Sequence, residues 1–303
     1  MAVYNYAEQF ERELQQKYVR ELTCNSLMLS NPQIKFINAQ TIKLPKITVS
    51  GYKDHNRNNL GFNTGTMTNE WEPKKLEHDR DIELFIDPMD VDETNLTLEM
   101  ANITNTFETE QAIPEMDSYV YSKLFAESKK YKDNGASIDT TVLTKSNILD
   151  WFDDDMCRMD DLGVPQEGRE LRLTSSVYKL LKQADAIQRT LDVSKGNNID
   201  RRVHSIEDVK IIKVPSARFK TLYDFTDGCV ADETARQINV MLTHPSCQVT
   251  RQKYSYIKTF TPGSDSRTGD KYLYQNRKFW DSFMIQNKAC AMAFNVEPEQ
   301  AAG

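Results

Sequence analysis

The first group of residues that could carry chemistry is an acidic run, DWFDDDMCRMDD, over residues 150–161. On a helix, the apolar side chains share one face: Leu149, Phe152, Met156 and Met159. Five aspartates point away from that face: Asp150, Asp153, Asp154, Asp160 and Asp161. Carboxylates can bind cations, but this run lacks the glycine turn of calcium loops and the histidine or cysteine spacing of zinc sites. We therefore predict a solvated helix face.

A second stretch, GSDSRTGDK over residues 263–271, is close to a phosphate-binding loop. That loop requires G-x-x-x-x-G-K-[ST]. Here five residues separate Gly263 from Gly269, and Asp270 stands where the lysine is needed. We predict a turn between two strands.

Histidine, serine and threonine residues are the remaining candidates for catalysis or metal binding. The four histidines lack a His or Glu partner at ligand spacing: His55, His78, His204 and His244. No G-x-S-x-G motif is present for a serine nucleophile. Thr174–Ser176 precede an apolar helical stripe, so we predict that they cap a helix. The sequence thus predicts no catalytic residue, no cofactor-binding residue and no metal ligand, and therefore a protein that is not an enzyme.

Composition further limits the class of protein to which the chain can belong. The chain has 303 residues and a net charge of -7, which argues against a sequence-wide electrostatic grip on nucleic acid. No apolar run is long enough for a membrane span, and the N-terminus carries charges where a secretory signal needs apolar residues. The five cysteines are scattered, as expected of free thiols in a cytosol.

The N-terminal segment predicts a helix over residues 5–29. Phe10, Leu14, Tyr18 and Leu22 recur four residues apart, and Asn31-Pro32 stops the pattern. Because no clear apolar partner lies nearby in the sequence, we expect this helix to be an arm.

Residues 40–88 predict one long two-stranded projection. TIKLPKITVSGY from Thr41 and RDIELFIDP from Arg80 alternate apolar and polar residues, and the stretch between them is rich in Asn, Gly and Thr. An isolated hairpin is marginally stable in water, and this one has few apolar residues at its tip. We expect it to need a surface that belongs to another molecule.

Helices and then strands follow. Asp90 and Glu93 predict the start of a long helix, Pro114 breaks or kinks it, and a second helix ends at Gly135. Residues 144–162 predict another helix, capped at Thr144 or Ser146 and closed by Gly163. Strands recur as DVKIIKVP, INVML and KACAMAFNVEP, the last covered on both faces. The fold class is therefore α+β.

The order of these segments resembles a known family. Five stretches carry the likeness, over about residues 40–298: DRDIELFIDPMDVDET, IPEMDSYVYSKL, VPQEGRELRLTSSVYKLL, VKIIKVPSARF and YQNRKFWDSFMIQNKACAMAF. Together they resemble the major capsid proteins of tailed double-stranded-DNA bacteriophages, which share the Hong Kong ninety-seven type capsid fold with encapsulin shells.

The resemblance implies a domain plan. Residues 1–39 would be an N-terminal arm, 40–88 an extended β-hairpin loop, and 89–135 the spine helix and peripheral domain. Residues 136–249 would form the axial domain, and 250–303 would return to the peripheral domain and end the chain. Because the arm is short and begins with Met1, we expect no large cleaved scaffolding segment.

The resemblance also implies a function. Copies of the chain would assemble through pentamers and hexamers into an icosahedral shell that encloses double-stranded DNA without sequence-specific binding. The protein would lie in the virion capsid after assembly in the host bacterial cytoplasm, with a portal protein at one vertex and with scaffolding or decoration proteins as further partners. Two alternatives stay open: an encapsulin-like compartment for protein cargo, and a soluble α/β hydrolase or nucleotide-binding enzyme.

Within the projection, charged and aromatic residues are the expected intersubunit contacts: Asp54, Arg57, Trp71, Glu72, Lys75, Asp79 and Arg80. Some family members cross-link a loop lysine to an asparagine of a neighbour. Lys53, Lys74 and Lys75 lie in the loop, but no motif identifies a partner asparagine, so we predict no cross-link.

Overall fold

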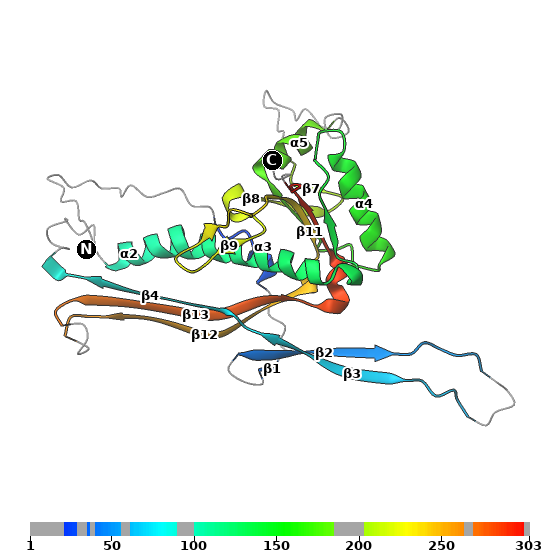
Figure 1. The fold of residues 1–303 in the computed structure, drawn as a ribbon, viewed down its shortest axis with the longest axis horizontal. Coiled ribbons are helices and arrows are strands. Elements are labelled where there is room, and N and C mark those ends of the chain that lie inside the picture. The colour runs from blue at the N-terminus through cyan, green and yellow to red at the C-terminus, as the bar shows by residue number, and fades with distance from the viewer. Residues whose placement is uncertain are drawn as a thin grey trace, which may run out of the picture.

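The computed structural model describes residues 21–28, 35–36, 40–55, 61–89, 100–184, 203–263 and 269–299. The described part is elongated (Figure 1). A three-stranded sheet and a helical run lie along the long axis, a six-stranded sheet stands beside them, and a β-hairpin projects from one end. Among the described helices, none is both long and apolar enough to cross a membrane.

The three-stranded antiparallel sheet has β13 (Tyr272–Met284) between β12 (Gln248–Phe260) and β4 (His78–Ile86). One side is covered by α2 (Met100–Phe107), a π-helical turn (Glu108–Ala112) and α3 (Ile113–Lys130). Alternate β13 side chains face these helices: the amide of Asn276 donates to Glu108, and Trp280 packs edge-on against Tyr119. The sheet and the helices therefore form one two-layer unit.

The regular α-helix is interrupted before Pro114, as predicted, and Pro114 lies in the first turn of α3, but the chain stays helical across the interruption. α2 and α3 lie in one line, joined by the π-helical turn. In a regular α-helix the proline ring would clash with the carbonyl of residue 110, and the wider π-helical turn before Pro114 accommodates the ring. Gly135, with a φ of 92°, ends this stretch as predicted. The predicted cap at Asp90 and Glu93 lies outside the described residues.

The six-stranded sheet has the order β5-β14-β11-β6-β8-β7. Its strands are β5 (Ser137–Asp139), β14 (Met292–Val296), β11 (Ile238–Thr243), β6 (Glu170–Thr174), β8 (Val209–Val214) and β7 (Ser205–Ile206). Every residue of β14 is buried, which confirms a strand covered on both faces. With α4 (Ile148–Asp161) and α5 (Ser175–Gln183), this sheet completes the mixed helix and sheet content of an α+β fold. A short ribbon of β9 (Tyr223–Asp224) and β10 (Val230–Ala231) lies beside α3.

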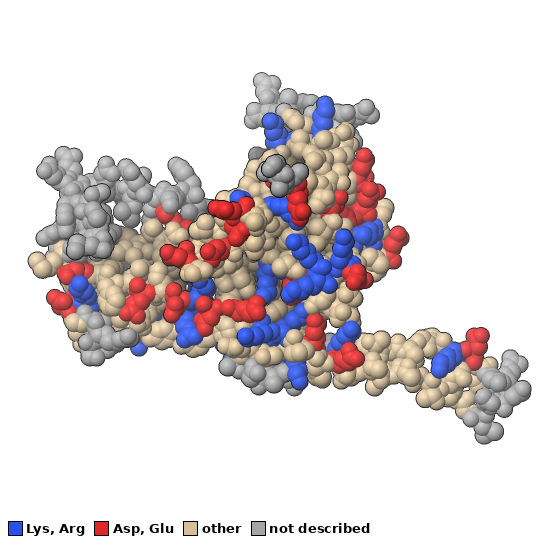
Figure 2. Space-filling model, in the orientation of Figure 1, with Lys and Arg blue, Asp and Glu red and all other residues tan. Residues whose placement is uncertain are grey.

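The projecting hairpin is shorter than predicted. β2 (Thr41–Val49) pairs with β3 (Met67–Lys75), and β1 (Lys35–Phe36) adds a short third strand at the base. The predicted second strand, now β4, pairs instead with β13. Leu76 marks the change of direction because it is buried with Ile42 and Leu44 in an apolar cluster on the three-stranded sheet. The space-filling view shows the hairpin standing clear of the body (Figure 2).

The end of the predicted N-terminal helix has a different structure. Residues 1–20 and 29 lie outside the described residues, and residues 21–28 contain a 3-10 turn (Asn25–Leu27) in place of an α-helix. Cys24 and Leu27 are fully buried in the main core. Residues 23–27, which we call the N-terminal clasp, therefore pack in the core through partners distant in the sequence rather than belonging to a free helical arm.

Hydrogen bonds hold the clasp to three parts of the fold. On α3, the buried carboxylate of Asp117 accepts hydrogen bonds from the backbone N–H groups of Thr23 and Cys24, each at 3.0 Å. The Leu27 carbonyl accepts from Gln248 and Thr250 on β12. Ser26 donates to Glu170 on β6 at 2.5 Å. The clasp thus ties the helical run to both sheets.

Asp117 also accepts a hydrogen bond from Arg218 at 3.0 Å, so its charge is paired inside the core. Asp117→Ala removes the carboxylate that binds the Arg218 guanidinium and the two clasp N–H groups. We expect this variant to lower the free energy of unfolding of the unassembled subunit by about 3–5 kcal/mol, measured by urea denaturation. Asp154→Ala, which removes an exposed aspartate from α4, is the matched control and should change stability by about 0.5 kcal/mol or less. Equal losses for the two variants would contradict the role of Asp117.

Candidate interaction surfaces

The two faces of the hairpin differ in chemistry because side chains alternate along each strand. In the observed register Ile47 lies opposite Asn69 and Val49 opposite Met67, and Trp71 shares their face. The other face carries Ile42 and Leu44 near the base, then the cross-strand pairs Lys46–Glu70 and Thr48–Thr68. One face is therefore polar beyond the base. The other carries Thr41, Lys43 and Lys75 at the base and is apolar beyond them apart from Asn69.

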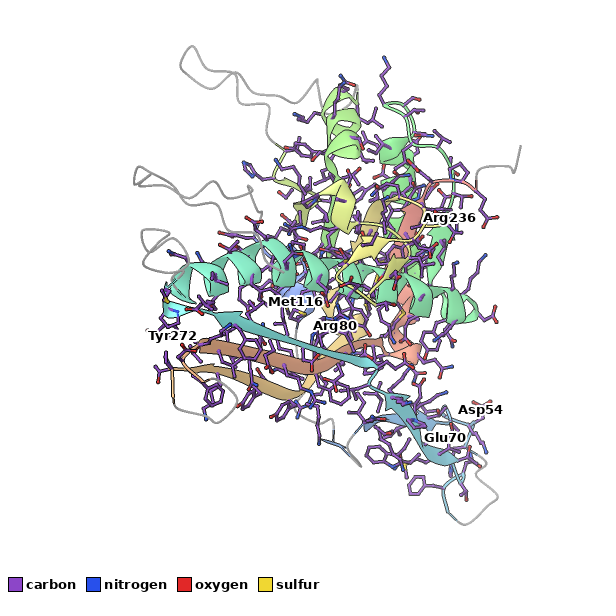
Figure 3. The ribbon with its side chains drawn as sticks, turned by 60° about the vertical axis from the view of Figure 1, so that its left-hand side comes forward. Asp54, Glu70, Arg80, Met116, Arg236 and Tyr272 are labelled. Atoms are coloured by element: carbon purple, nitrogen blue, oxygen red, sulfur yellow. The ribbon has the colours of Figure 1, made fainter. Side chains whose placement is uncertain are left out.

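Four side chains define what we call the apolar hairpin face. Their exposed fractions are 61% for Ile47, 69% for Val49, 73% for Met67 and 45% for Trp71. The view in Figure 3, with Asp54 and Glu70 labelled, shows the hairpin extending away from the body. Soluble proteins seldom expose a contiguous apolar patch unless another surface covers it. The apolar hairpin face is therefore the leading candidate for an interaction surface.

The distribution of exposed apolar residues supports this choice. Of the fourteen large hydrophobic side chains exposed in the described ranges, six lie in the hairpin: Ile47, Val49, Tyr52, Phe62, Met67 and Trp71. The hairpin makes up a small part of the chain, so this concentration is a local feature and not the scattered exposure normal for protein surfaces.

Cross-strand hydrogen bonds continue past the ends of β2 and β3. The Ser50 N–H donates to the Thr66 carbonyl at 2.9 Å, and Thr66 N–H donates to the Ser50 hydroxyl at 2.9 Å. Farther out, Asn63 donates to the Asp54 carbonyl at 2.7 Å, and the Lys53 ammonium to the Thr64 carbonyl at 3.1 Å. The described tip residues therefore hold a defined shape beyond the ladder.

The base of the hairpin is fixed to α3 by a buried cation. Lys74 lies 3.0 Å from Glu72 and 3.5 Å from Glu127, and it also donates to the Tyr131 hydroxyl. Burial opposes the charged form, but the Tyr131 hydroxyl and the two carboxylates outweigh it and raise the pKa of Lys74. Because Glu127 also accepts from the Met284 N–H, the same carboxylate connects hairpin, helix and sheet.

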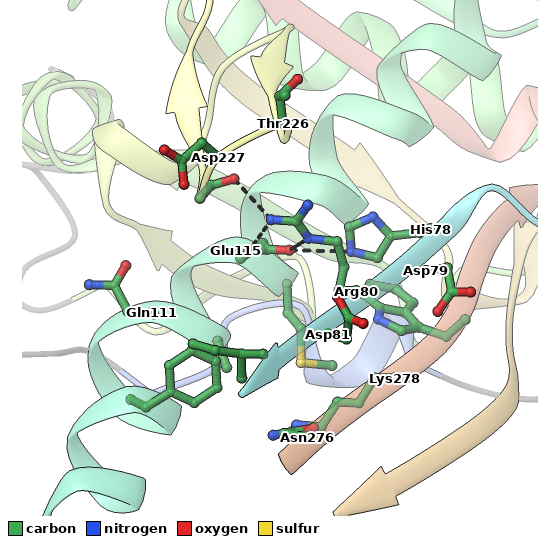
Figure 4. A pocket seen from close by; sticks show the side chains of 16 residues that line it. His78, Asp79, Arg80, Asp81, Gln111, Glu115, Thr226, Asp227, Asn276 and Lys278 are labelled. Atoms are coloured by element: carbon green, nitrogen blue, oxygen red, sulfur yellow. Dashed lines mark hydrogen bonds and ion pairs between the residues drawn. The ribbon is translucent and has the colours of Figure 1, made fainter. Parts of the chain in front are cut away.

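A cleft of about 460 Å³ lies between β4, the helical run and residues 226–228 (Figure 4). Arg80 crosses it, donating to Glu115 on α3 at 2.7 Å and to the carbonyls of Phe225 and Gly228. The guanidinium thus joins the sheet, the helix and the β9–β10 ribbon, and its donors are used in holding these elements together.

His78 forms the inner wall of this cleft. Its ring stacks on Tyr119 at 3.7 Å between centroids and meets Trp280 edge-on at 5.0 Å. Burial, with the nearby Arg80 cation, lowers the pKa of His78 to about 3. His78 is therefore neutral near neutral pH, and its 3.6 Å approach to Glu115 is a polar contact rather than an ion pair.

Comparison with known proteins identifies the fold. No protein-family model and no curated protein matched the sequence. Solved structures did match, at identities that include 9% and 13%. The bacteriophage PhiM1 mature capsid aligns with a TM-score of 0.71 at 12% identity, over 98% of this chain and 93% of that one. The cyanophage P-SCSP1u capsid aligns with a TM-score of 0.71 at 10% identity, over 97% and 93%.

A structure from Mycobacterium phage Che8 aligns with a TM-score of 0.64 at 12% identity, over 97% of this chain and 98% of that one. The chain has a phage capsid fold. This finding confirms the resemblance seen in the sequence, and it covers nearly the whole chain.

The seven residues predicted as intersubunit contacts differ in their surroundings in the structure. Asp54, Trp71 and Lys75 are exposed. Three others have partners within the chain: Glu72 with Lys74, Asp79 with Arg277, and Arg80 with Glu115. Arg57 lies outside the described residues. An intersubunit contact for any of the seven stays a prediction.

The motifs on the rest of the capsid fold serve local structure. Phe152, Met156 and Met159 of α4 are buried, Leu149 packs partly buried against the core, and the five predicted aspartates are exposed, as expected. α4 begins later than predicted, at Ile148 after Asn147, whose side chain accepts from Thr144 N–H at 2.7 Å. Within the described residues, no group of three or more His, Cys, Asp or Glu side chains could hold a metal ion.

The predicted helix cap and the predicted turn are both confirmed. The Thr174 hydroxyl accepts from the Val177 N–H at the start of α5, which is the expected helix cap. Gly263 and Gly269 close the turn between β12 and β13 through a 2.8 Å backbone hydrogen bond.

Sequence reasoning missed the buried carboxylates of Asp117, Glu127 and Asp281, because an acidic residue within a polar stretch carries no local signal of burial.

Arg80 provides a test of the internal ion pair. Because Arg80 and Glu115 are joined within one subunit, a double-mutant cycle with Arg80→Ala and Glu115→Ala should give a coupling energy of about 1 kcal/mol or more in the unfolding of unassembled subunits. Zero coupling there, together with coupling in assembled particles, would instead show that Arg80 acts between subunits.

Acid should weaken the Asp79–Arg277 pair. The hydrogen bonds from Arg277, at 3.0 and 2.7 Å, lower the pKa of Asp79 below its ordinary value of 3.8. A carboxyl group whose pKa is lower in the folded state stabilises the fold above the unfolded value and loses that effect as pH falls through the folded value. Asp79→Asn should therefore destabilise the subunit at neutral pH but not well below pH 3.8, measured by urea denaturation. Asp54→Asn is the matched control, and a difference independent of pH would contradict the pairing.

Proposed function

We propose that this chain is the major capsid protein of a tailed phage, whose copies assemble through pentamers and hexamers into an icosahedral shell around double-stranded DNA. The observation that carries the proposal is the apolar hairpin face, which stays exposed in a molecule with a phage capsid fold. The hairpin points away from the body, and a second copy would supply the surface for this face.

Symmetry explains why such a contact builds a shell. A hairpin of one copy that binds a different surface of the next copy makes a head-to-tail contact, and such contacts close into rings when the rotation allows. Burial of apolar surface contributes about 25 cal/mol per Å². Each copy in a ring both gives a hairpin and receives one, so the stabilisation grows with the number of copies assembled.

The domain plan and partners follow from this proposal. The hairpin would be the extended loop, the helical run with the three-stranded sheet the spine helix and peripheral domain, and the six-stranded sheet the axial domain. A portal protein would occupy one vertex, scaffolding or decoration proteins would be further partners, and the shell would assemble in the host bacterial cytoplasm. The chain is acidic overall, and on the face in Figure 2 basic and acidic side chains are interspersed, which favours enclosing DNA without sequence-specific binding.

Electron microscopy of the purified protein tests the proposal. Wild-type protein should form shells, rings or tubes, and double-stranded DNA should fill particles isolated from infected cells. Particles that hold protein cargo would favour an encapsulin-like compartment, and a discrete monomer would contradict assembly.

Substitutions on the two hairpin faces make the test specific. Ile47→Ser and Trp71→Ser each remove an exposed apolar side chain that assembly would bury, so each should lower shell yield by about tenfold or more. Thr48→Ser lies on the polar face of the same strand and should assemble like wild type. Urea denaturation should show that all three subunits are folded. Equal yields from both faces would contradict an assembly role for the apolar hairpin face.

A further inference from the structure

The strand β4 forms one edge of the three-stranded sheet. Within the described residues it pairs with β13 alone, in a regular register from His78 to Ile86. An edge strand presents a row of backbone N–H and C=O groups that no neighbouring strand pairs. β4 has nine residues, about 30 Å of strand, so this row is long enough to bind a further strand.

The other sheet edges are short or irregular in the part of the chain that the structure describes. β5 has three residues, and β1, β7, β9 and β10 have two each. β12 has a register shift between Gln252 and Tyr254, and β3 contains Pro73. Shortness, bulges and proline all keep edge strands from pairing with other chains. None of these features is present in β4, whose edge is protected only by charged residues such as Asp79 and Asp81.

The cleft described above runs along this free edge. Five consecutive residues of β4, 78–82, line it. Consecutive side chains point to opposite faces of a sheet, so a cleft that touches both sets lies beside the edge of the strand. Figure 4 shows β4 on one side of the cleft, Gln111 and Glu115 of the helical run on another, and Asp227 of the β9–β10 ribbon on a third. The unpaired backbone row therefore opens into a cleft of about 460 Å³.

The inner wall of the cleft is apolar. Ile82 of β4, Phe107 and Met116 of the helical run and Trp280 of β13 line it. An extended peptide that binds a sheet edge gains affinity from main-chain hydrogen bonds and specificity from surfaces that receive its alternate side chains. This wall would receive apolar side chains at every second position of such a peptide.

The charges around the cleft favour a basic partner. Its two cations are already bound within the subunit, Arg80 by Glu115 at 2.7 Å and Lys278 by Glu108 at 3.1 Å. Asp81 and Asp227 are exposed and form no hydrogen bond or ion pair with the described residues. The cleft thus combines an unpaired strand edge, an apolar wall and two carboxylates that a basic partner could neutralise.

We propose that the free edge of β4 binds an extended segment of a different protein as a fourth strand of the sheet, and that this segment alternates apolar and basic residues. Its apolar side chains would pack on Ile82, Phe107 and Met116. Its basic side chains would lie on the other face, where they would pair with Asp81 across the strands and approach Asp227. This contact goes beyond the proposed assembly function and does not depend on it.

A synthetic peptide tests the contact in unassembled full-length subunits. The probe is a fluorescent eight-residue peptide of alternating lysine and valine, and binding is followed by fluorescence anisotropy. The probe should bind with saturation, and a peptide of alternating glutamate and valine should bind at least about tenfold more weakly. Equal binding of the two peptides, or no binding of the lysine peptide, would overturn the proposal.

Backbone methylation separates strand addition from simple charge attraction. N-methylation of all valines removes the N–H donors from one edge of the extended probe, and N-methylation of all lysines removes them from the other edge. One methylated peptide should therefore bind at least about tenfold more weakly, while the other binds like the parent. Equal affinities of the two methylated peptides would overturn strand addition, because their charges are the same.

Hydrogen exchange followed by mass spectrometry locates the added strand. The lysine–valine probe should slow amide exchange in residues 78–86 and leave residues 248–260, the opposite edge strand, unchanged. Protection of residues 248–260 without residues 78–86 would overturn the assignment to β4.

Two variants test the carboxylates at the cleft. Asp81→Asn and Asp227→Asn should each weaken binding of the probe by about threefold or more, with the same urea denaturation as wild type. Asp154→Asn, on the exposed face of α4, is the matched control and should bind like wild type. Wild-type affinity in both cleft variants would contradict the proposal.

The other possible occupant is a second copy of the chain. Peptides with the sequences of residues 41–49 and 67–75 represent the two strands of its hairpin. We expect both to bind at least about tenfold more weakly than the lysine–valine probe, because neither alternates apolar and basic residues throughout and each contains a proline. Equal affinity for either peptide would assign the edge to a second copy and overturn a separate partner.

Discussion

The arrangement of the fold depends on the buried carboxylate of Asp117. A charge inside a core is costly unless hydrogen bonds and an opposite charge compensate it, and Asp117 has both. Its partners come from the N-terminal clasp and from Arg218, residues that are far apart in the sequence. Because the clasp also binds β6 and β12, this one carboxylate fixes the clasp that sets the helical run between the two sheets. These internal hydrogen bonds therefore position the surfaces that the chain offers to other molecules.

Lys74 attaches the base of the hairpin to α3. A two-stranded ribbon has no core of its own, so its direction depends on how its base is attached. Ile42, Leu44 and Leu76 supply apolar contact with the sheet, and the Lys74–Glu127 pair adds a directional bond to α3. The hairpin therefore has its base bonded to α3 and to the sheet, while its apolar face is uncovered.

The sequence predicted individual helices and strands better than it predicted which of them contact one another. Alternation located the strands that became β2 and β4, and helical spacing assigned the buried and solvated faces of α4, because these signals are local. The partner of β4 was mispredicted, since β13 lies almost 200 residues later and turn chemistry favoured the nearer strand. The clasp was missed for the same reason: the acceptor of the Thr23 and Cys24 N–H groups is 94 and 93 residues away. The π-helical turn has no sequence pattern of its own, and a proline alone pointed to a break.

Ion pairs within the subunit use charged groups that were expected to bind a neighbouring copy. Glu72, Asp79 and Arg80 are three of the six charged groups that the sequence offered for intersubunit bonds, and all three are paired within the subunit. The hairpin surface left for a neighbour is mainly apolar. Ion pairs demand particular distances and directions, whereas apolar burial depends on area and tolerates small rotations. A contact made mainly by the apolar hairpin face would therefore suit a subunit proposed to occupy both five-fold and six-fold rings, where the angle between neighbours differs.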